Sequence, residues 1–330
     1  MIDESRVALL AATDTEIVLC SRADGDWRPV ARFAIPAQVT CVAAVPGRVL
    51  VGTTDGIVRM DTPGGGMERV PLDVPHVRWI AFHPEDGALA FAGTEPAAIL
   101  RSGDGGRTWR ECAEVARLRD EHGWYLPYSP RAGCVRSFAF HGRRGYAAVE
   151  VGGVVRSDDG GETWRLAAGS TEPPHIGAVP PEGPAVHPDV HSVAVDPSSP
   201  DLVFAATNGG LFRSEDRGAS WKRISGDVYT RALWLDPADA THIVHGAATR
   251  AGWNGGIEES TDGGTTWGKG RGMEMPWHRD PVERLEAIGG ELFAVTEEGR
   301  ILACPLGGGA WRRVLEDVPG VVTVAAWEGR

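Results

Sequence analysis

Residues 156–165 read RSDDGGETWR, and the pattern of this stretch decides the fold. The same spacing, Ser-x-Asp-x-Gly-x-Thr/Ser-Trp, recurs in RSGDGGRTWR (101–110), RSEDRGASWK (213–222) and ESTDGGTTWG (259–268). The aspartate can accept hydrogen bonds from nearby backbone amides, and the glycine can adopt a positive φ. Each copy therefore predicts a tight hairpin turn with the tryptophan packed beneath it. Partial copies occur in SRADGDW (21–27), MDTPGGGM (60–67) and CPLGGGAW (304–311).

This pattern resembles the Asp-box (BNR) repeat, which in that family joins the third and fourth strands of a β-propeller blade. Counted from Trp27, with Met67 in place of one tryptophan, successive copies are 40, 42, 55, 57, 46 and 44 residues apart. A repeat of about 40–44 residues is the length of a four-stranded blade. The two longer spacings indicate insertions within a regular array.

The number of units and the chain ends predict how the array closes. Seven units are present, and the first opens directly with RVALLAAT (6–13), without a leading strand. A spare strand-like segment, GVVTVAAW (320–327), follows the last unit. We therefore expect an all-β fold, a single domain over 1–330 that forms a seven-bladed β-propeller with four-stranded blades. Its C-terminal strand would pair into the first blade, which removes the open sheet edges.

Charge and cysteine content limit the function. Asp and Glu number 45 against 33 Lys and Arg, and the net charge of −12 disfavours nucleic acid and anionic membranes as partners. No apolar run approaches the ~18–20 residues of a membrane span, and the N-terminal segment lacks the pattern of a signal peptide. The five cysteines include no CxxC pair, which argues against a disulfide framework and against a structural zinc site. We expect a cytoplasmic protein.

A polar or charged residue stands second in most of the predicted inner strands. The segments VRWIAFHP (77–84), VRSFAFHG (135–142), VHSVAVDP (190–197) and TRALWLDP (230–237) align without gaps. Because inner strands line the channel of a propeller, these second residues are predicted to form a ring at its mouth. The ring consists of Thr40, Arg78, Arg136, His191, Arg231 and Glu283, with Arg284 as the alternative to Glu283. Clustered arginines need an anion to offset their charge, and guanidinium groups suit carboxylate and phosphate.

Insertions and aromatic residues are expected around the same mouth. The insertions lie at about 113–134, 170–189, 250–256 and 272–281, all in connections that the propeller topology places on the mouth face. The aromatic residues predicted to contact a ligand are Trp124, Tyr125, Tyr128, Tyr229, Trp253 and Trp277. One divalent metal ion is a further prediction, with His187, His191 and His278 as its predicted ligands. Without a metal, His191 is one more polar wall residue.

The resemblance leaves the activity open. Sialidases share the Asp boxes and bind a sugar carboxylate with three arginines, but they have six blades and need a nucleophilic tyrosine, whose counterpart here is not established. Endoglucanases with two seven-bladed halves and sortilin-type receptors belong to the same group. Photosystem II assembly factors do as well, and they are single seven-bladed propellers.

Three functions follow from these patterns. The leading hypothesis is a small anionic molecule bound in the funnel by Arg78, Arg136 and Arg231, with His191 and Glu283 as an acid–base pair for hydrolase or lyase chemistry. One alternative is a protein-interaction or assembly scaffold that binds an acidic partner segment. The other is a sialidase-like glycoside hydrolase.

Overall fold

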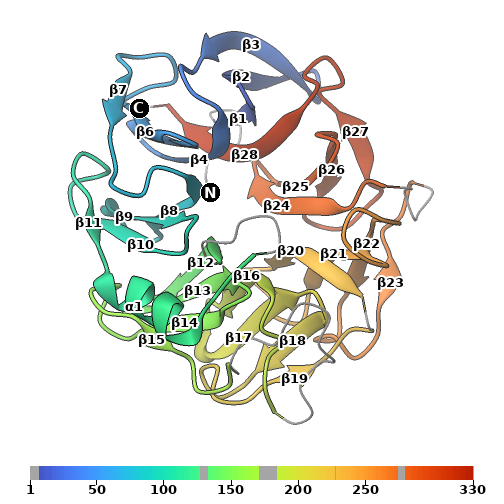
Figure 1. Ribbon diagram of the computed structural model, residues 1–330. Coiled ribbons are helices and arrows are strands. Elements are labelled where there is room, and N and C mark those ends of the chain that lie inside the picture. Colours follow the sequence, from blue (N-terminus) through green and yellow to red (C-terminus); the bar gives the residue numbers. More distant parts are fainter. Residues whose placement is uncertain (1–6, 127–132, 171–183, 227, 274–278, 330) are drawn as a thin grey trace.

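Seven four-stranded antiparallel sheets surround a central channel in the computed structural model, which describes residues 7–126, 133–170, 184–226, 228–273 and 279–329 (Figure 1). From the inner to the outer strand, blade 1 consists of β28 (Val321–Glu328), β1 (Val7–Thr13), β2 (Glu16–Ala23) and β3 (Asp26–Ala34). Blade 2 consists of β4 (Val39–Val45), β5 (Arg48–Thr53), β6 (Gly56–Met60) and β7 (Glu68–Val70). Blade 3 consists of β8 (Val77–His83), β9 (Asp86–Thr94), β10 (Ile99–Ser102) and β11 (Arg110–Glu111).

The other four blades follow the same order around the channel. Blade 4 consists of β12 (Cys134–His141), β13 (Arg144–Glu150), β14 (Gly153–Ser157) and β15 (Arg165–Leu166), and blade 5 of β16 (Val190–Asp196), β17 (Ser199–Thr207), β18 (Gly210–Ser214) and β19 (Lys222–Arg223). Blade 6 consists of β20 (Tyr229–Leu235), β21 (Ile243–Ala248), β22 (Gly256–Ser260) and β23 (Gly268–Lys269). Blade 7 consists of β24 (Val282–Ile288), β25 (Glu291–Thr296), β26 (Ile301–Pro305) and β27 (Arg312–Val314). The predicted seven-bladed all-β fold is confirmed.

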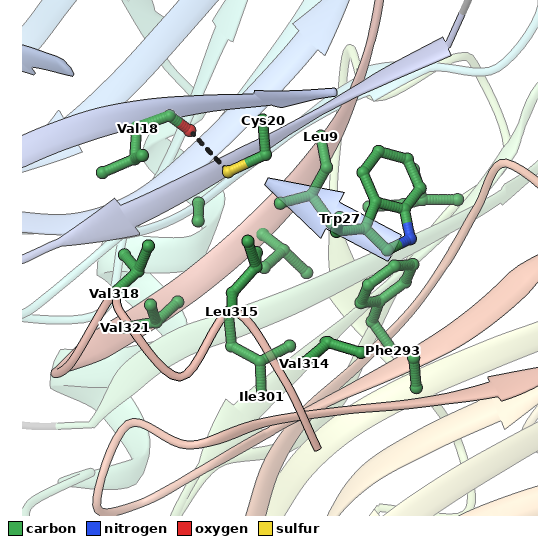
Figure 2. Packing of buried hydrophobic residues seen from close by; sticks show 14 of the residues in the cluster. Leu9, Val18, Cys20, Trp27, Phe293, Ile301, Val314, Leu315, Val318 and Val321 are labelled. Carbon is green, nitrogen blue, oxygen red and sulfur yellow. Dashed lines mark hydrogen bonds between the residues drawn. The ribbon is translucent and has the colours of Figure 1, made fainter. Parts of the chain in front are cut away.

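The ring closes where the sequence predicts, because β28 pairs with β1 as the innermost strand of blade 1. The core lies between neighbouring blades, and the cluster between blades 7 and 1 shows how the closure is held (Figure 2). Leu9 and Trp27 from blade 1 pack there with Phe293 and Ile301 from blade 7, and Val321 comes from the closing strand. Burying these side chains stabilises the junction between the two ends of the chain.

Each full Asp box forms the predicted turn. In the box of blade 4, Asp159 accepts hydrogen bonds from the Ser157 hydroxyl (2.8 Å), the Glu162 amide (3.0 Å), and the amide and hydroxyl of Thr163 (3.0 and 2.6 Å). Gly161 has a φ of 77° and lies against Phe91 of blade 3, where a Cβ would approach the ring to 2.1 Å. The box glycine is therefore required both by its backbone conformation and by the packing between blades.

One insertion differs from the expectation. The segment 113–134 begins with the helix α1 (Ala113–His122), which lies beside β10, the third strand of blade 3, and β15, the outer strand of blade 4, and not over the inner strands (Figure 1). Its residues are good helix formers, and Val115 is buried against the core between blades 3 and 4. The prediction that this whole insertion covers the mouth is therefore wrong for its helical part.

Within the described residues, no helix is both long and apolar enough to cross a membrane.

Replacing Asp159 by alanine should lower the free energy of unfolding by about 2 kcal/mol, because several backbone and side-chain donors lose their acceptor. Burial opposes ionisation of this carboxyl, but the hydrogen bonds from Thr163 and Ser157 lower the pKa of Asp159 to about 2. Its folded-state pKa lies below the ordinary 3.8, so the stabilisation is present above pH 3.8 and lost as the pH falls through about 2. Urea denaturation at pH 7 and at pH 3 measures both effects.

The control for this variant is Asp73→Ala, a change of an exposed aspartate between β7 and β8. A loss of stability in Asp159→Ala no larger than in this control would contradict the role given to the Asp box.

Candidate functional site

A β-bulge near the mouth end of every inner strand builds the candidate site. The mouth is the end of the channel at which the inner strands begin. There the ladder between the first and second strands skips a residue in each blade. The skipped residues are Thr40, Arg78, Arg136, His191, Arg231 (together with Ala232), Glu283 and Val322. A bulge re-aims a side chain out of the regular alternation, so the predicted ring has a common structural cause. It also assigns Glu283 and not Arg284 to the ring.

Most of the ring residues surround one cavity. Its volume is about 270 Å³, and its lining includes Arg78, Arg136, Arg231, Glu283 and Arg284. Thr40, Val322 and Glu297 also contribute to the lining. The site is therefore strongly polar, with four arginines around a space that is open to the mouth.

Glutamates within the protein offset two of the predicted ligand-binding arginines. Arg136 donates to Glu150 (3.0 Å) and to Glu283 (3.4 Å), and Arg231 donates to both oxygens of Glu283 (2.8 and 2.7 Å). Burial opposes ionisation of Glu283, but the guanidinium groups of Arg231 and Arg136 outweigh it and lower the pKa of this carboxyl. The catalytic role predicted for Glu283 stays a prediction, and its contacts favour a permanently ionised partner of the arginines.

Sequence reasoning missed the other glutamates of this network. Three glutamates lie at the mouth end of second strands, next to the inner strand of the same blade. They are Glu95 at β9, Glu150 at β13 and Glu297 at β25. Glu95 forms an ion pair with Arg78 at 3.5 Å, and Glu150 forms one with Arg136 at 3.0 Å. The signal was present in GTEP (93–96), VEVG (149–152) and TEEG (296–299), because aligning second strands as carefully as first strands places the three glutamates together.

Arg284 has different surroundings from Arg136 and Arg231. Its guanidinium donates to the backbone carbonyl of Thr40 (3.1 Å) and lies 4.1 Å from the ring centre of Trp79. Burial and the positive charges of Arg136 and Arg78, partly offset by Cys41 and Glu283, lower the pKa of Arg284 to about 10. Among the described residues, no carboxylate oxygen forms an ion pair with Arg284 within 4.0 Å. The residue remains protonated at neutral pH, and its charge is the least compensated of the cavity.

His191 is not among the residues that line the cavity and is buried in the wall where blades 4, 5 and 6 meet. It is 3% exposed, its Nδ1 lies 2.7 Å from the backbone carbonyl of Thr230, and its ring packs 4.9 Å from that of Tyr229. Its Nε2 lies 3.3 Å from the Asp189 carboxylate. Glu150, Asp189 and His191 each offer an atom that could bind a metal, all within 4.8 Å of one another. His187 is buried next to this group but is not a member of it.

The aromatic predictions have mixed outcomes. Trp124 is 2% exposed in the core between blades 3 and 4, so its predicted role as a ligand lid is wrong. Tyr229 is buried and accepts a hydrogen bond from Arg231, which makes it a support of the ring. Trp253 lies between the guanidinium groups of Arg250 and Arg279, each 4.6 Å from its ring centre.

The remaining predicted residues add little. Tyr125 is half-buried after α1. Tyr128, Trp277 and His278 lie outside the described residues.

Comparisons with known proteins agree with the repeat and the fold. The profile of the BNR/Asp-box repeat matches residues 155–166. The chain is 30% identical over 151 residues to the xyloglucanase Xgh74A of Acetivibrio thermocellus, covering 40% of this chain and 16% of that enzyme. It is 35% identical over 100 residues to a xyloglucanase of Hypocrea jecorina, covering 24% of this chain and 12% of the relative. The matches thus span less than one fifth of the length of these relatives.

Two groups of solved structures share the propeller. An ancestral GH74 enzyme superposes with a TM-score of 0.62 at 17% identity, covering 84% of this chain and 38% of that one. YCF48 bound to D1 peptide superposes with a TM-score of 0.60 at 15% identity, covering 96% and 92% of the two chains. The protein is therefore a seven-bladed β-propeller that contains a BNR/Asp-box repeat. Within that class, its structural neighbours include both glycoside hydrolases and YCF48 propellers.

Replacing Glu283 by glutamine should lower the free energy of unfolding by about 3 kcal/mol at pH 7, because Arg136 and Arg231 lose their shared carboxylate in a largely buried place. The folded-state pKa of Glu283 is below the ordinary 4.5, so this stabilisation is present above pH 4.5 and lost as the pH falls below it. The difference from wild type should therefore narrow in acid. Urea denaturation curves at pH 7 and pH 4 measure it.

Glu298→Gln removes a half-exposed carboxylate near the same cavity and is the matched control, with an expected change below about 0.5 kcal/mol. Equal stability of Glu283→Gln and wild type at pH 7 would show that the arginine–glutamate network does not hold the mouth together.

Proposed function

We propose that the protein is a binding module whose mouth cavity receives one carboxylate or phosphate group between Arg78 and Arg284. The observation that carries this proposal is the position of Arg284, which lines the cavity and forms no ion pair within 4.0 Å with a carboxylate of the described residues, so that Glu283 offsets its charge only in part. An anionic group beside it would restore the missing charge balance. Arginine suits this role because its planar fork matches both kinds of anion.

The arginines do not contribute equally. Arg136 and Arg231 are engaged by Glu150 and Glu283 at distances between 2.7 and 3.4 Å. Arg78 is 3.5 Å from Glu95, and that oxygen of Glu95 has no hydrogen-bond partner among the described residues. The side of the cavity lined by Arg78 and Arg284 therefore has the guanidinium groups that are least engaged by carboxylates.

The cavity size indicates what enters. A volume of about 270 Å³ lies just below the ~300–1,000 Å³ of common small-molecule pockets. It suits a short acid or the anionic end of a longer molecule. The similarity to YCF48 bound to D1 peptide extends over nearly the whole chain and supports a peptide as the longer molecule, at the level of the fold.

A second candidate is glycoside hydrolysis, which the similarity to xyloglucanases supports. One feature of the cavity also favours it. Burial and the charge of Glu283 raise the pKa of Glu297, whereas the arginines lower that of Glu283. Two carboxyl groups with pKa values shifted in opposite directions form the kind of pair that such enzymes use.

Binding of an anion should disappear when Arg284 is replaced. We expect succinate, phosphate or a peptide ending in a free carboxylate to raise the melting temperature of wild type. Arg284→Met should weaken the affinity, measured by isothermal titration calorimetry, by at least about tenfold, because a charge-assisted hydrogen bond is lost. Arg28→Met, on the exposed outer strand β3, is the matched control and should bind as wild type does.

The probes separate the sources of the anionic group. Tighter binding of the peptide than of both its amidated form and succinate would identify a peptide terminus as the ligand. Tighter binding of succinate than of the peptide would identify a small acid. Release of reducing sugar from xyloglucan by wild type but not by Glu297→Gln would favour the second candidate. Equal affinities of Arg284→Met and wild type for every anion would overturn the proposed site.

A further inference from the structure

The wall between blades 4 and 5 contains three potential metal ligands that the anion-binding proposal does not use. Glu150 ends the second strand of blade 4, and Asp189 and His191 open the inner strand of blade 5. His191 Nε2 and one oxygen of Asp189 are both buried, and neither has a hydrogen-bond partner in the part of the chain that the structure describes. Leaving such atoms unpaired is costly, so this place in the wall calls for a positively charged occupant.

We infer that Glu150, Asp189 and His191 form a binding site for one divalent transition-metal ion of the zinc class. One imidazole nitrogen and two carboxylates are ligands that zinc accepts, and three protein ligands leave a fourth position for water or a ligand atom. This inference is independent of anion binding between Arg78 and Arg284, since it involves other residues on another side of the mouth.

The orientation of the imidazole fits a metal ligand. A backbone carbonyl can only accept a hydrogen bond, so the contact of His191 Nδ1 with the Thr230 carbonyl at 2.7 Å requires a proton on Nδ1. The lone pair of the neutral ring is then on Nε2, which faces Asp189. A second hydrogen bond of this kind fixes the tautomer of most metal-binding histidines.

The separation of the two unpaired atoms also fits. His191 Nε2 and Asp189 Oδ1 are 3.3 Å apart but do not form a hydrogen bond. Two ligand atoms that each lie about 2.0–2.1 Å from a tetrahedral zinc are separated by about 3.3 Å. Glu150 offers its atom within 4.8 Å of the other two, so a side-chain movement of at most about 1.5 Å completes the set.

The local charges favour a cation over an empty wall. On this side of the mouth, Arg136 and Arg231 form ion pairs with Glu150 and Glu283, and Asp189 adds a third carboxylate beside Glu150 and His191. With a neutral His191, two positive charges stand against three negative ones. A carboxylate has two oxygens, so Glu150 can bind a metal and still accept from Arg136. The wall thus has an excess of one negative charge, which a bound cation would offset.

The test is titration of the metal-free protein of residues 1–330 with Zn²⁺, followed by calorimetry, and with Co²⁺, followed by its visible absorption. We expect one equivalent of Zn²⁺ to bind and to raise the melting temperature, whereas the same concentration of Mg²⁺ has no effect. Asp189→Asn and His191→Gln should each weaken Zn²⁺ binding by at least about 100-fold and abolish the Co²⁺ absorption.

The matched control is His242→Gln. His242 also lies between two carboxylates, but each of its ring nitrogens contacts one of them, at 3.1 Å to Asp236 and 2.9 Å to Glu259, so no ring nitrogen is left for a metal. Its loss should leave Zn²⁺ binding unchanged. If wild type binds no Zn²⁺, or if Asp189→Asn binds it as tightly as wild type does, the inference is overturned and the group is a histidine–carboxylate ion pair. Melting curves of the metal-free variants show that each is folded before it is titrated.

Discussion

The functional surface depends on one local constraint, the extra residue near the start of each inner strand. A regular strand would alternate its side chains between the two neighbouring blades, and the packing between blades would then tolerate few charged groups. The bulge frees one residue per blade from this alternation and from its place in the ladder. Because the same irregularity repeats around the ring, residues as distant in sequence as Thr40 and Val322 line one cavity.

The fold could be predicted from the sequence because its determinants are local and repeated. The hydrogen bonds of Asp159 and the positive φ of Gly161 depend on neighbours within the same turn, and a regular spacing carries that information around the whole molecule. The helix α1 was missed for the opposite reason. Its position depends on Val115 packing against residues of two blades, which the repeat pattern does not encode.

The candidate site was predictable only in part. Alignment of the first strands identified the ring and left one ambiguity, which the bulge at Glu283 resolves. The identity of the counter-ions could not be derived in that way, since Glu150 comes from a different strand and Asp189 from the end of a connection. The excess of arginines that sequence reasoning assigned to an external anion is mostly balanced from within. Arg284, in contrast, forms no ion pair with a carboxylate of the described residues, and one buried oxygen of Asp189 has no hydrogen-bond partner among them.

The closing strand determines when the cavity can form during synthesis of the chain. Synthesis on the ribosome proceeds from the N-terminus, so β1 is made long before β28, the strand that lies inside it and lines the channel beside β4 and β24. Blades 2 to 7 can form in order as they emerge. The cavity needs Val321 and Val322, so no nascent chain that lacks them can present a finished mouth. Formation of the cavity is thereby delayed until β28 has completed blade 1, and a chain truncated before β28 exposes the unpaired edge of β1 instead.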